Sequence, residues 1–332
     1  MIEVIIATYN RYQTAHNLAL NLIESTKAID SVIIVNSDSN KNVLKSVHPK
    51  IKRISTSHQN QPYQRYLGYR VSTAPHLLFL DDDMELIDSK VFDDINSLFE
   101  DQKIVAINLP FENNNNFLEN QPKGLVDAEN KLRKIIGLLS GYPMAKPNHY
   151  ICNGIRGSRL SGKPIEYLSG GAFAVKREAL YVNFNMQLFS IYEEKLGKGE
   201  DGILGYTLNK QGRIFAYPEK CFVHNDFKDS TYSNSQKAFT TRVLFSRLYL
   251  SCEYYRLNER SIIYAYLRFY HYILGRLVGS VVSYLLKPTK IKYDILMGSF
   301  SALVKSLKFK FHDSLKDNSN WNLEVTKELK GN

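Results

Sequence analysis

Three adjacent aspartates, Asp81, Asp82 and Asp83, follow directly on the apolar run HLLFL at residues 76–80. Neighbouring carboxylates repel one another, so a bound cation would offset the repulsion. Carboxylates are hard oxygen ligands that suit Mg²⁺ or Mn²⁺, above all where substrate phosphates complete the coordination. The tract therefore predicts a divalent-cation site for a phosphorylated substrate. A simpler alternative is that Asp82 and Asp83 only cap the next turn.

A second acidic pair, Glu200 and Asp201 in the motif GED, opens a stretch with helical spacing. Acids in the first turn of a helix are favoured by the macrodipole, so they could be structural. A carboxylate near a substrate hydroxyl could instead act as a general base. Gly170–Gly171 predicts a tight turn in any case. His224, at the end of an apolar run, is either a structural histidine or a further metal ligand.

Alternating strands and helices must position these residues. Apolar, β-branched runs predict strands over residues 3–10, 31–40, 76–80, 103–109 and 213–226, the last ending at His224. Helical spacing predicts helices over residues 11–25, 60–74, 88–100 and 198–212, and residues 164–180 predict a strand, the Gly-Gly turn and a helix. This alternation indicates βαβ units and a parallel sheet with both faces covered.

In such sheets, ligands bind beyond the carboxyl ends of the strands. Asn10, Asp38 and aspartates 81–83 all lie at predicted strand ends, so we expect them to meet at one edge. The first glycine is Gly68, which excludes a Gly-rich dinucleotide-binding turn or a P-loop after the first strand. Residues 110–166 are irregular and predict a long excursion, either an acceptor-facing lid or a surface insertion.

The composition is that of a globular protein. The 332 residues are 44% hydrophobic and 23% charged. The three cysteines, Cys152, Cys221 and Cys252, are far apart and odd in number, which argues against a disulfide framework or a zinc knuckle and favours a reducing cytoplasm. The first residues lack a basic region followed by a long apolar one, so we expect no signal peptide. No uncharged apolar stretch reaches the ~18 residues of a membrane-spanning helix.

From about residue 231 the sequence becomes rich in Tyr, Leu and Arg, with helical spacing. Residues 237–332 carry 16 Lys/Arg against 7 Asp/Glu, which accounts for nearly all of the net charge of +10. We therefore predict an α/β domain over residues 1–230 and a basic helical segment over residues 231–332. Arg268, His271 and Arg276 interrupt its most apolar part, which favours helices lying on an anionic membrane surface. Packing on the first domain or homo-oligomerisation is the alternative.

Five motifs occur in the order VIIATYNR, VIIVNSDS, QRYLGYRVSTAPHLLFLDDD, YLSGGAFAVKREAL and GEDGILGYTLNKQGRI. Each is degenerate alone, but together, over roughly residues 2–226, the chain resembles the family 2 glycosyltransferases of the GT-A fold. The resemblance implies a mostly parallel, nucleotide-sugar-binding α/β sheet flanked by helices, with the C-terminal helical segment added. It also implies a metal-dependent, inverting sugar transfer that uses Mn²⁺ or Mg²⁺.

The resemblance assigns nucleotide-binding roles to the ends of the first two strands. Thr8, Tyr9 and Arg11 fall in the first nucleotide loop. Asp38, or its neighbour Asn36, would contact the base.

Further donor-binding roles fall on the next helix and strand. Arg65, followed by Gly68, stands where the family has an arginine near the nucleotide. Asp81 and Asp83 correspond to the DxD pair that touches ribose and metal, with Asp83 as the direct metal ligand. Asp82, between them, joins the donor-binding set.

The remaining roles concern the acceptor side. Gly170 and Gly171 would shape the wall near the donor sugar and the acceptor. Asp201 matches the catalytic base, with Glu200 beside it. His224 falls where some members have a further metal ligand.

The sequence departs from the family pattern in two places. Asn36 and Ser37 stand where many members have paired acids, with Asp38 one place later, and this weakens the case for a UDP-sugar, which stays the expected donor. The QxxRW motif of processive members is absent, because the only tryptophan is Trp321 in SNWN. We therefore expect transfer of a single sugar.

These features predict an enzyme of bacterial surface polysaccharide synthesis that acts on a glycan or a lipid-linked acceptor. We expect it in the cytoplasm, peripheral on the inner face of the cell membrane. One alternative is a nucleotidyltransferase, which usually needs a Gly-rich loop after the first strand; another is a non-catalytic membrane- or sugar-binding scaffold, against which the DDD and GED tracts argue. The basic tail permits nucleic-acid binding, but the sequence has no such motif, so we expect no nucleic-acid partner.

Overall fold

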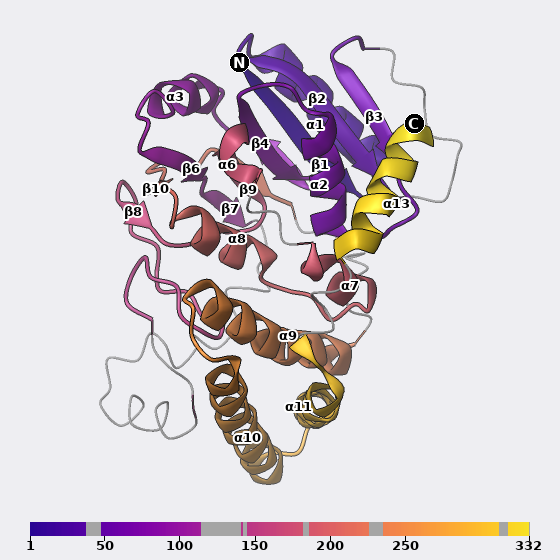
Figure 1. Cartoon of the computed structure of the whole chain (residues 1–332), viewed down its shortest axis with the longest axis vertical. Helices are drawn as coiled ribbons and strands as arrows, with labels where there is room; N and C mark the ends of the chain where they lie inside the picture. The colour runs from indigo at the N-terminus through magenta and orange to yellow at the C-terminus, as the bar shows by residue number, and fades with distance from the viewer. Residues whose placement is uncertain are drawn as a thin grey trace.

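The computed structural model describes residues 1–37, 48–113, 141, 145–181, 186–225, 235–311 and 318–331. At its centre an eight-stranded sheet has the strand order β3-β2-β1-β4-β9-β6-β10-β8 (Figure 1). Its strands are β1 (Ile2–Thr8), β2 (Ile29–Asn36), β3 (Ile51–Ser55), β4 (His76–Asp81), β6 (Ile104–Asn108), β8 (Pro164–Ile165), β9 (Ala172–Lys176) and β10 (Arg213–Ala216). The central strands are apolar runs buried on both faces, as IEVIIAT of β1 is.

The sheet is mostly parallel, as predicted. β1, β2, β3 and β4 run parallel, and β6 pairs parallel with β10. With helices on both faces and more helices after residue 235, this confirms the predicted fold class. β9 runs antiparallel to both β4 and β6 at the centre of the sheet. An antiparallel strand starts where its neighbours end, so the Gly170–Gly171 turn lies at the carboxyl edge, where Asp81 N donates to Gly171 O at 2.9 Å.

A second, three-stranded sheet has the order β5-β11-β7. It contains β5 (Met84–Leu86), β7 (Phe111–Asn113) and β11 (Phe222–His224). The single strand predicted over residues 213–226 is wrong, because β10 and β11 belong to different sheets. Pro218 lies between them, and proline cannot donate to a strand ladder. The break lets His224 pair with Met84, directly after the triple aspartate.

Helices cover both faces of the large sheet. They are α1 (Tyr12–Ser25), α2 (Gln61–Val71), α3 (Lys90–Leu98), α6 (Arg177–Leu180), α7 (Gln187–Glu193) and α8 (Glu200–Leu208). On one face, Leu18 of α1 and Phe92 of α3 share a core with Val4 and Ile6 of β1. The intervening Ile5 faces the other core, which includes residues of α2, α7 and α8. The period of two along β1 thus divides the molecule into two cores.

The helices described after residue 235 are α9 (Gln236–Leu257), α10 (Ile262–Leu286), α11 (Lys290–Lys308) and α13 (Asn318–Gly331). α9 packs beneath the sheet layer, with α10 and α11 on its far side (Figure 1). Leu244, Leu248 and Tyr249 of α9 are buried in the same cluster as α2 and α8. Within the residues described here, no helix combines the length and apolar character that crossing a bilayer requires. The predicted domain boundary at residues 230/231 lies outside the described residues.

The terminal helix α13 returns to the first half of the chain, beside β3 and α2 (Figure 1). Glu328 Oε1 accepts a hydrogen bond from Thr56 Oγ1 at 2.9 Å, and Glu328 Oε2 accepts one from Tyr63 OH at 2.9 Å. The half-buried Trp321 ring lies 5.2 Å from the Tyr63 ring and 5.5 Å from the Phe189 ring, measured between centres. These contacts attach the end of the basic segment to the face that carries α2.

We predict that Trp321→Ala loosens this attachment. The substitution should lower the free energy of unfolding by about 2 kcal/mol, below the ~3–5 kcal/mol of a fully buried aromatic residue, because the Trp321 side chain is only half-buried. Urea denaturation measures the change. Leu323→Ala is the matched control, since Leu323 is 57% exposed on the same helix and should cost little. Equal effects of the two variants would contradict the packing role of Trp321.

Candidate active site

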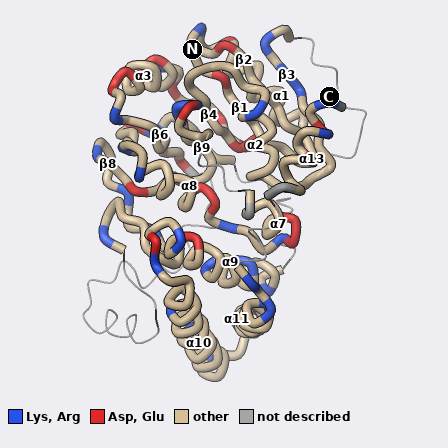
Figure 2. Tube along the Cα trace, viewed as in Figure 1, with Lys and Arg blue, Asp and Glu red and all other residues tan. Residues whose placement is uncertain are grey.

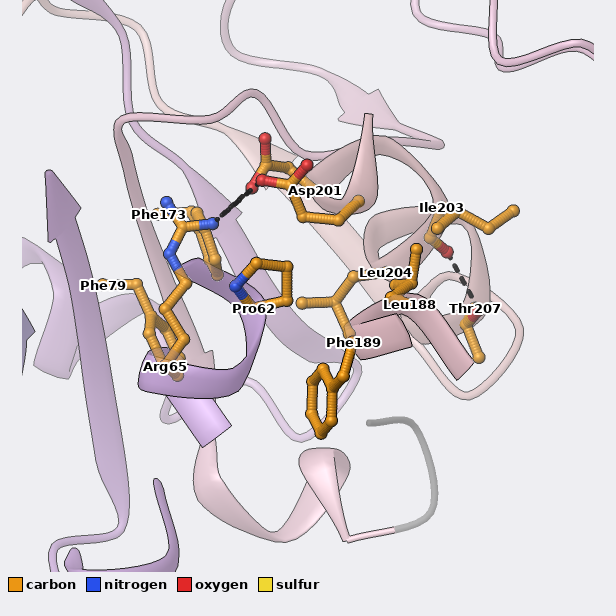
Figure 3. Close-up of a pocket in the computed structure, with 11 residues that line it drawn as sticks. Pro62, Arg65, Phe79, Phe173, Leu188, Phe189, Asp201, Ile203, Leu204 and Thr207 are labelled. Carbon is orange, nitrogen blue, oxygen red and sulfur yellow. Dashed lines mark hydrogen bonds and ion pairs between the residues drawn. The ribbon is translucent and has the colours of Figure 1, made fainter. Parts of the chain in front are cut away.

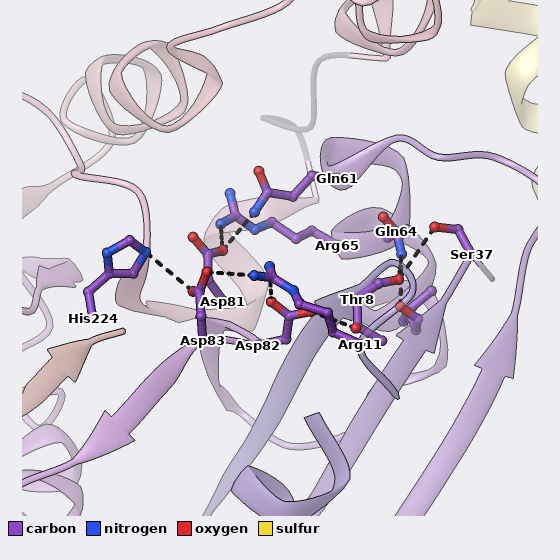
Figure 4. A network of polar contacts seen from close by, with 11 residues as sticks. Thr8, Arg11, Ser37, Gln61, Gln64, Arg65, Asp81, Asp82, Asp83 and His224 are labelled. Carbon is purple, nitrogen blue, oxygen red and sulfur yellow. Dashed lines mark hydrogen bonds and ion pairs between the residues drawn. The ribbon is translucent and has the colours of Figure 1, made fainter. Parts of the chain in front are cut away.

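Arg65 lies at the centre of the site. α2 begins under the Asn60 cap, whose side chain accepts a hydrogen bond from Tyr63 N, and this fixes the position of Arg65 on the first turns. Its guanidinium donates from Nη1 to Asp201 Oδ1 at 2.6 Å and from Nη2 to Asp81 Oδ1 at 2.8 Å (Figures 3 and 4). One arginine therefore joins the end of β4 to the start of α8.

The environment keeps Arg65 charged. Arg65 is 4% exposed, and burial alone would lower its pKa; the carboxylates of Asp201, Asp81 and Glu200 outweigh this and raise the pKa instead. Glu200 Oε1 lies 3.4 Å from Arg65 Nη1. The guanidinium also lies over the Phe173 ring, with Cζ 5.3 Å from the ring centre.

The second arginine, Arg11, holds the other two aspartates of the tract (Figure 4). Its Nε and Nη2 donate to the two oxygens of Asp82 at 3.2 and 2.5 Å, a bidentate pair, and Thr8 Oγ1 donates to Asp82 Oδ2 at 2.6 Å. Arg11 Nη1 lies 3.2 Å from Asp83 Oδ2, and His224 Nε2 lies 3.3 Å from Asp83 Oδ1. β1, β4 and β11 thus contribute to one polar network.

The pKa values of two of the three aspartates are raised, and that of the third is lowered. Burial raises the pKa of Asp81, with the Arg65 charge opposing it. Burial likewise raises the pKa of Asp82 to about 7 in spite of Arg11. Burial would also raise the pKa of Asp83, but the hydrogen bond and charge of His224, together with Arg11, lower it. Asp83 is therefore the aspartate most strongly held in its anionic form.

The acidic pair lies in the first turn of α8. Gly199 precedes it with φ at 91°, a left-handed conformation that suits glycine. Burial, followed by the charge of Asp201, raises the pKa of Glu200 well above its ordinary value, and Tyr192 OH donates to Glu200 Oε2. Gly170 approaches from the turn before β9: a Cβ there would lie 2.4 Å from Asp201 Oδ2. The absence of a side chain at residue 170 therefore leaves room for the Asp201 carboxylate.

A mostly apolar pocket opens beside the ion pair between Arg65 and Asp201 (Figure 3). It is lined by Pro62, Arg65, Phe79, Phe173, Leu188, Phe189, Glu200, Asp201, Ile203, Leu204 and Thr207. Its walls come from α2, β4, β9, α7 and α8. The low polarity around the ion pair strengthens the electrostatic contacts of the site.

Most of the predicted site residues come together. Thr8 pairs with Asn36 in register across β1 and β2, and Asn36 is buried. Tyr9 is half-exposed at the end of β1. Gly171 has φ at 103°, and a Cβ there would lie 2.3 Å from Met84 Cε. Asp38, predicted to contact the base, lies outside the described residues.

Sequence reasoning missed several residues that hold the site. Gln61 Nε2 donates to Asp81 Oδ1 at 2.7 Å, and Gln64 Nε2 donates to the carbonyl oxygens of Thr8 and Val35 at 2.8 Å each. Residues 61, 64 and 65 lie near one face of α2 because of their helical spacing. Once Arg65 is assigned to the site, this spacing predicts that Gln61 and Gln64 also face it. The contact between Tyr192 and Glu200 has no comparable signal.

The predicted metal ligands come together only in part. Within the described residues, His, Cys, Asp and Glu side chains do not gather in threes in a way that could hold a metal ion. Asp83 Oδ1 and His224 Nε2 face each other at 3.3 Å, and a carboxylate with an imidazole suits Mn²⁺. The Asp81 oxygen Oδ1 is instead directed to Arg65 and Gln61. Asp83 and His224 therefore fit the ion, and Asp81 is occupied by its own ion pair.

Acids and arginines thus meet at the carboxyl edge of a mostly parallel α/β sheet, the edge at which such sheets bind their ligands. The sequence model described as Glycosyl transferase family 2 matches residues 3–184. The chain therefore belongs to glycosyl transferase family 2, which confirms the resemblance seen in its motifs.

Solved structures similar to this chain include the mannosyltransferase PcManGT from Pyrobaculum calidifontis in complex with GDP-Man and Mn²⁺, at 14% identity and a TM-score of 0.48, covering 92% of this chain and 86% of that chain. S. aureus TarS 1-349 is similar at 13% identity and a TM-score of 0.49, covering 100% of this chain and 92% of that chain. The same protein in complex with UDP-GlcNAc gives 12% identity, a TM-score of 0.48 and coverage of 99% and 92%. A search of curated proteins gave no match.

We predict that Gly170→Ala impairs sugar transfer without unfolding the chain. The added Cβ would displace the Asp201 carboxylate, and misplacing a reacting group by ~1 Å can cost roughly 100-fold in rate. Gly279→Ala is the matched control, because a Cβ at residue 279 meets nothing within 4 Å and alanine favours the α10 helix. Transfer rate and thermal unfolding of both variants check this. A Gly170→Ala enzyme with the wild-type rate would contradict the placement of Asp201.

Proposed function

We propose that this chain transfers one sugar from a nucleotide sugar, a UDP-sugar in the first instance, to a hydroxyl group of a glycan or lipid-linked acceptor, with inversion at the anomeric carbon. The observation that carries the proposal is the bridge made by Arg65. The same guanidinium contacts Asp81, at the predicted donor end of β4, and Asp201, the predicted base. A donor diphosphate bound near Arg65 would therefore lie within reach of the base.

Donor binding would draw on both arginines. Arg11 follows the carboxyl end of β1, and Arg65 lies in α2. A diphosphate bound beyond the carboxyl edge of the sheet would contact both guanidinium groups. Asp83 and His224 would hold Mn²⁺ or Mg²⁺ together with phosphate oxygens of the donor. When bound, the ion would stabilise the charge that develops on the leaving diphosphate.

Asp201 fits the base better than Glu200 does. A general base must be ionised, and the raised pKa of Glu200 favours its protonated form. Asp201 contacts the Arg65 guanidinium at 2.6 Å, as a carboxylate would. When Arg65 turns to the donor phosphates, Asp201 can accept the proton of the acceptor hydroxyl. The hydroxyl oxygen then attacks the anomeric carbon from the face opposite the diphosphate, which inverts the configuration.

We predict that Asp201→Asn lowers the rate of sugar transfer by at least ~100-fold, because the amide cannot take the proton of the acceptor. The variant should still bind the nucleotide sugar, since Asp201 is not among its proposed ligands. The measurement is transfer or donor hydrolysis with a panel of UDP- and GDP-sugars in the presence of Mn²⁺.

Glu200→Gln is the matched control and should lose less activity than Asp201→Asn. The reverse order would transfer the role of base to Glu200. Full wild-type activity in excess chelator would contradict the metal-dependent part of the proposal. Turnover of nucleoside triphosphates, with none of nucleotide sugars, would favour a nucleotidyltransferase.

We also propose that the face of α10 directed away from α9 docks on an anionic membrane surface, which would be the cytoplasmic face of the cell membrane. Six exposed apolar residues lie on this face, hereafter the α10 stripe: Ile263, Leu267, Leu274, Val278, Val281 and Leu285. At ~100° per residue they fall within about 60° of one another around the helix. At ~1.5 Å per residue the stripe is about 33 Å long, an unusual length for unpartnered apolar surface.

The positive charge beside the α10 stripe favours an anionic membrane as the surface that binds it. Residues 261–311 carry eight Lys/Arg and one Asp/Glu. Lysines and arginines lie along the C-terminal helices in Figure 2, and Lys287 and Lys290 are exposed at the turn between α10 and α11. A second copy of the chain would bring the same positive charge and be repelled, whereas anionic lipid headgroups would be attracted. A lipid-linked acceptor in that membrane would then reach the site.

We predict that the full chain sediments with vesicles containing phosphatidylglycerol at low salt, and less so at high salt, because surface charge is screened. Replacing Val278 and Leu285 together by Asp should keep the chain in the supernatant. Ile87→Asp is the matched control, since Ile87 is 50% exposed between β5 and α3 and does not belong to α10. A full chain that ignores these vesicles contradicts the proposal. So does a dimer that the double variant converts to a monomer, which would assign the α10 stripe to a second copy.

A further inference from the structure

Four cationic side chains gather around the start of α8, the helix that carries Asp201. They are Arg156, Lys198, Arg242 and Arg247, hereafter the basic cluster, and their contacts with Phe239, Gly202 and Gly154 place them there. Lys198 comes directly before Gly199, the N-cap residue of α8, and Arg242 and Arg247 lie on α9. These elements differ from those that form the donor side, which is built from β1, α2, β4 and β11.

Phe239 joins two members of the basic cluster. Lys198 Nζ lies 4.7 Å from the centre of the Phe239 ring, and Arg242 Cζ lies 5.7 Å from the same centre. Two cations therefore share one aromatic ring, which favours positive charge near its face. Lys198 is exposed, whereas Arg242 is 8% exposed, so the cluster reaches from the core to solvent.

The other two members are fixed by backbone carbonyls. Arg247 Nη1 donates to Asn153 O at 2.9 Å, and Arg156 Nη1 donates to Leu168 O at 2.9 Å. A Cβ on Gly202 would lie 3.6 Å from Arg156 Cδ, so Arg156 lies against the residue that follows Asp201. Each of these contacts uses one of the five donors of a guanidinium group.

The like charges of the basic cluster repel one another. Among the residues the structure describes, the ion pairs within 4.0 Å include none made by Arg156, Lys198 or Arg247. Although part of the Lys198 side chain reaches solvent, the protein around its ammonium group desolvates it; this, followed by the charges of Arg242, Arg247 and Arg156, lowers the pKa of Lys198 to about 8. A bound anion would relieve this mutual repulsion.

We propose that the basic cluster binds a phosphate or diphosphate group of the acceptor and so places the acceptor hydroxyl beside Asp201. This inference rests on the proposed sugar transfer and narrows its acceptor to an anionic one. Arginine and lysine side chains are suited to phosphate oxygens, the former through bidentate contacts. The phosphate could belong to a lipid headgroup or to a soluble phosphorylated acceptor, and the chemistry of recognition is the same.

The test is calorimetric titration of the full chain with inorganic phosphate in excess chelator, which suppresses metal-assisted binding on the donor side. Wild type should bind, and Lys198→Gln and Arg156→Gln should each weaken binding at least ~10-fold, because each removes a charge-assisted contact. Lys103→Gln is the matched control and should bind as wild type does, since Lys103 is exposed before β6, at the opposite edge of the sheet. Lys198→Gln should unfold at or above the wild-type temperature, because it removes repulsion within the cluster.

A second arm uses vesicles containing phosphatidic acid, with phosphatidylglycerol vesicles as the reference. If Lys198→Gln also weakens binding to phosphatidic acid vesicles alone, the proposal holds and the phosphate belongs to a lipid. If inorganic phosphate alone is affected, the proposal holds and the acceptor is soluble. Unchanged binding in both arms, or no saturable phosphate binding by wild type, overturns it. Sugar transfer by Asp201→Asn tests the proposed function separately, so either claim can fail without the other.

Discussion

A buried guanidinium shared among carboxylates is the constraint on which this site depends. Arg65 loses its hydration on folding. The free energy of this desolvation is offset only where the geometry of the ion pairs and their hydrogen bonds are good. Its partners Asp81 and Asp201 lie at 2.8 and 2.6 Å but come from β4 and α8, and α2 supplies Arg65 itself. Removing one partner would leave buried charge uncompensated, so the positions of these three elements are coupled.

The same constraint accounts for the turn before β9. Asp201 occupies space that a side chain on Gly170 would need, and the carbonyl of Gly171 accepts the backbone hydrogen bond of Asp81. The antiparallel direction of β9 is what brings this turn to the carboxyl edge. Arg11 forms ion pairs with Asp82 and Asp83, as Arg65 does with Asp81 and Asp201. The two arginines thus compensate the negative charge of the acidic edge.

The helices after residue 235 complete the arrangement from the other side. α9 packs on α8 and shares a core with α7, and its basic residues lie beside the start of α8. α10 turns its apolar stripe away from α9. One segment therefore supports the proposed base, supplies the proposed acceptor site and carries the proposed membrane-docking face. Trp321 and Glu328 of α13 connect its end back to Tyr63 of α2, the helix of Arg65.

Local sequence patterns predicted the strands and helices whose formation depends mainly on neighbouring residues. The alternation of apolar runs and helical spacing was enough for β1, β2, β4 and α1 to α3, and the acids at the end of β4 followed from it. The break at Pro218 separates β10 from β11. Because apolar residues lie on both sides of Pro218, their periodicity predicted one continuous strand. The pairing of Arg11 with Asp82 and the approach of Gly170 to Asp201 depend on tertiary contacts 71 and 31 residues apart in sequence, which no spacing rule encodes.

The coupling between Arg65 and Asp201 tests the central claim most directly. Free energies of unfolding in urea are measured for wild type, Arg65→Met, Asp201→Asn and the double variant. If the guanidinium joins β4 and α8 into one site, the second substitution should cost less once the first is made, with a coupling energy of about 2 kcal/mol. Effects that add to within ~0.5 kcal/mol would contradict the account.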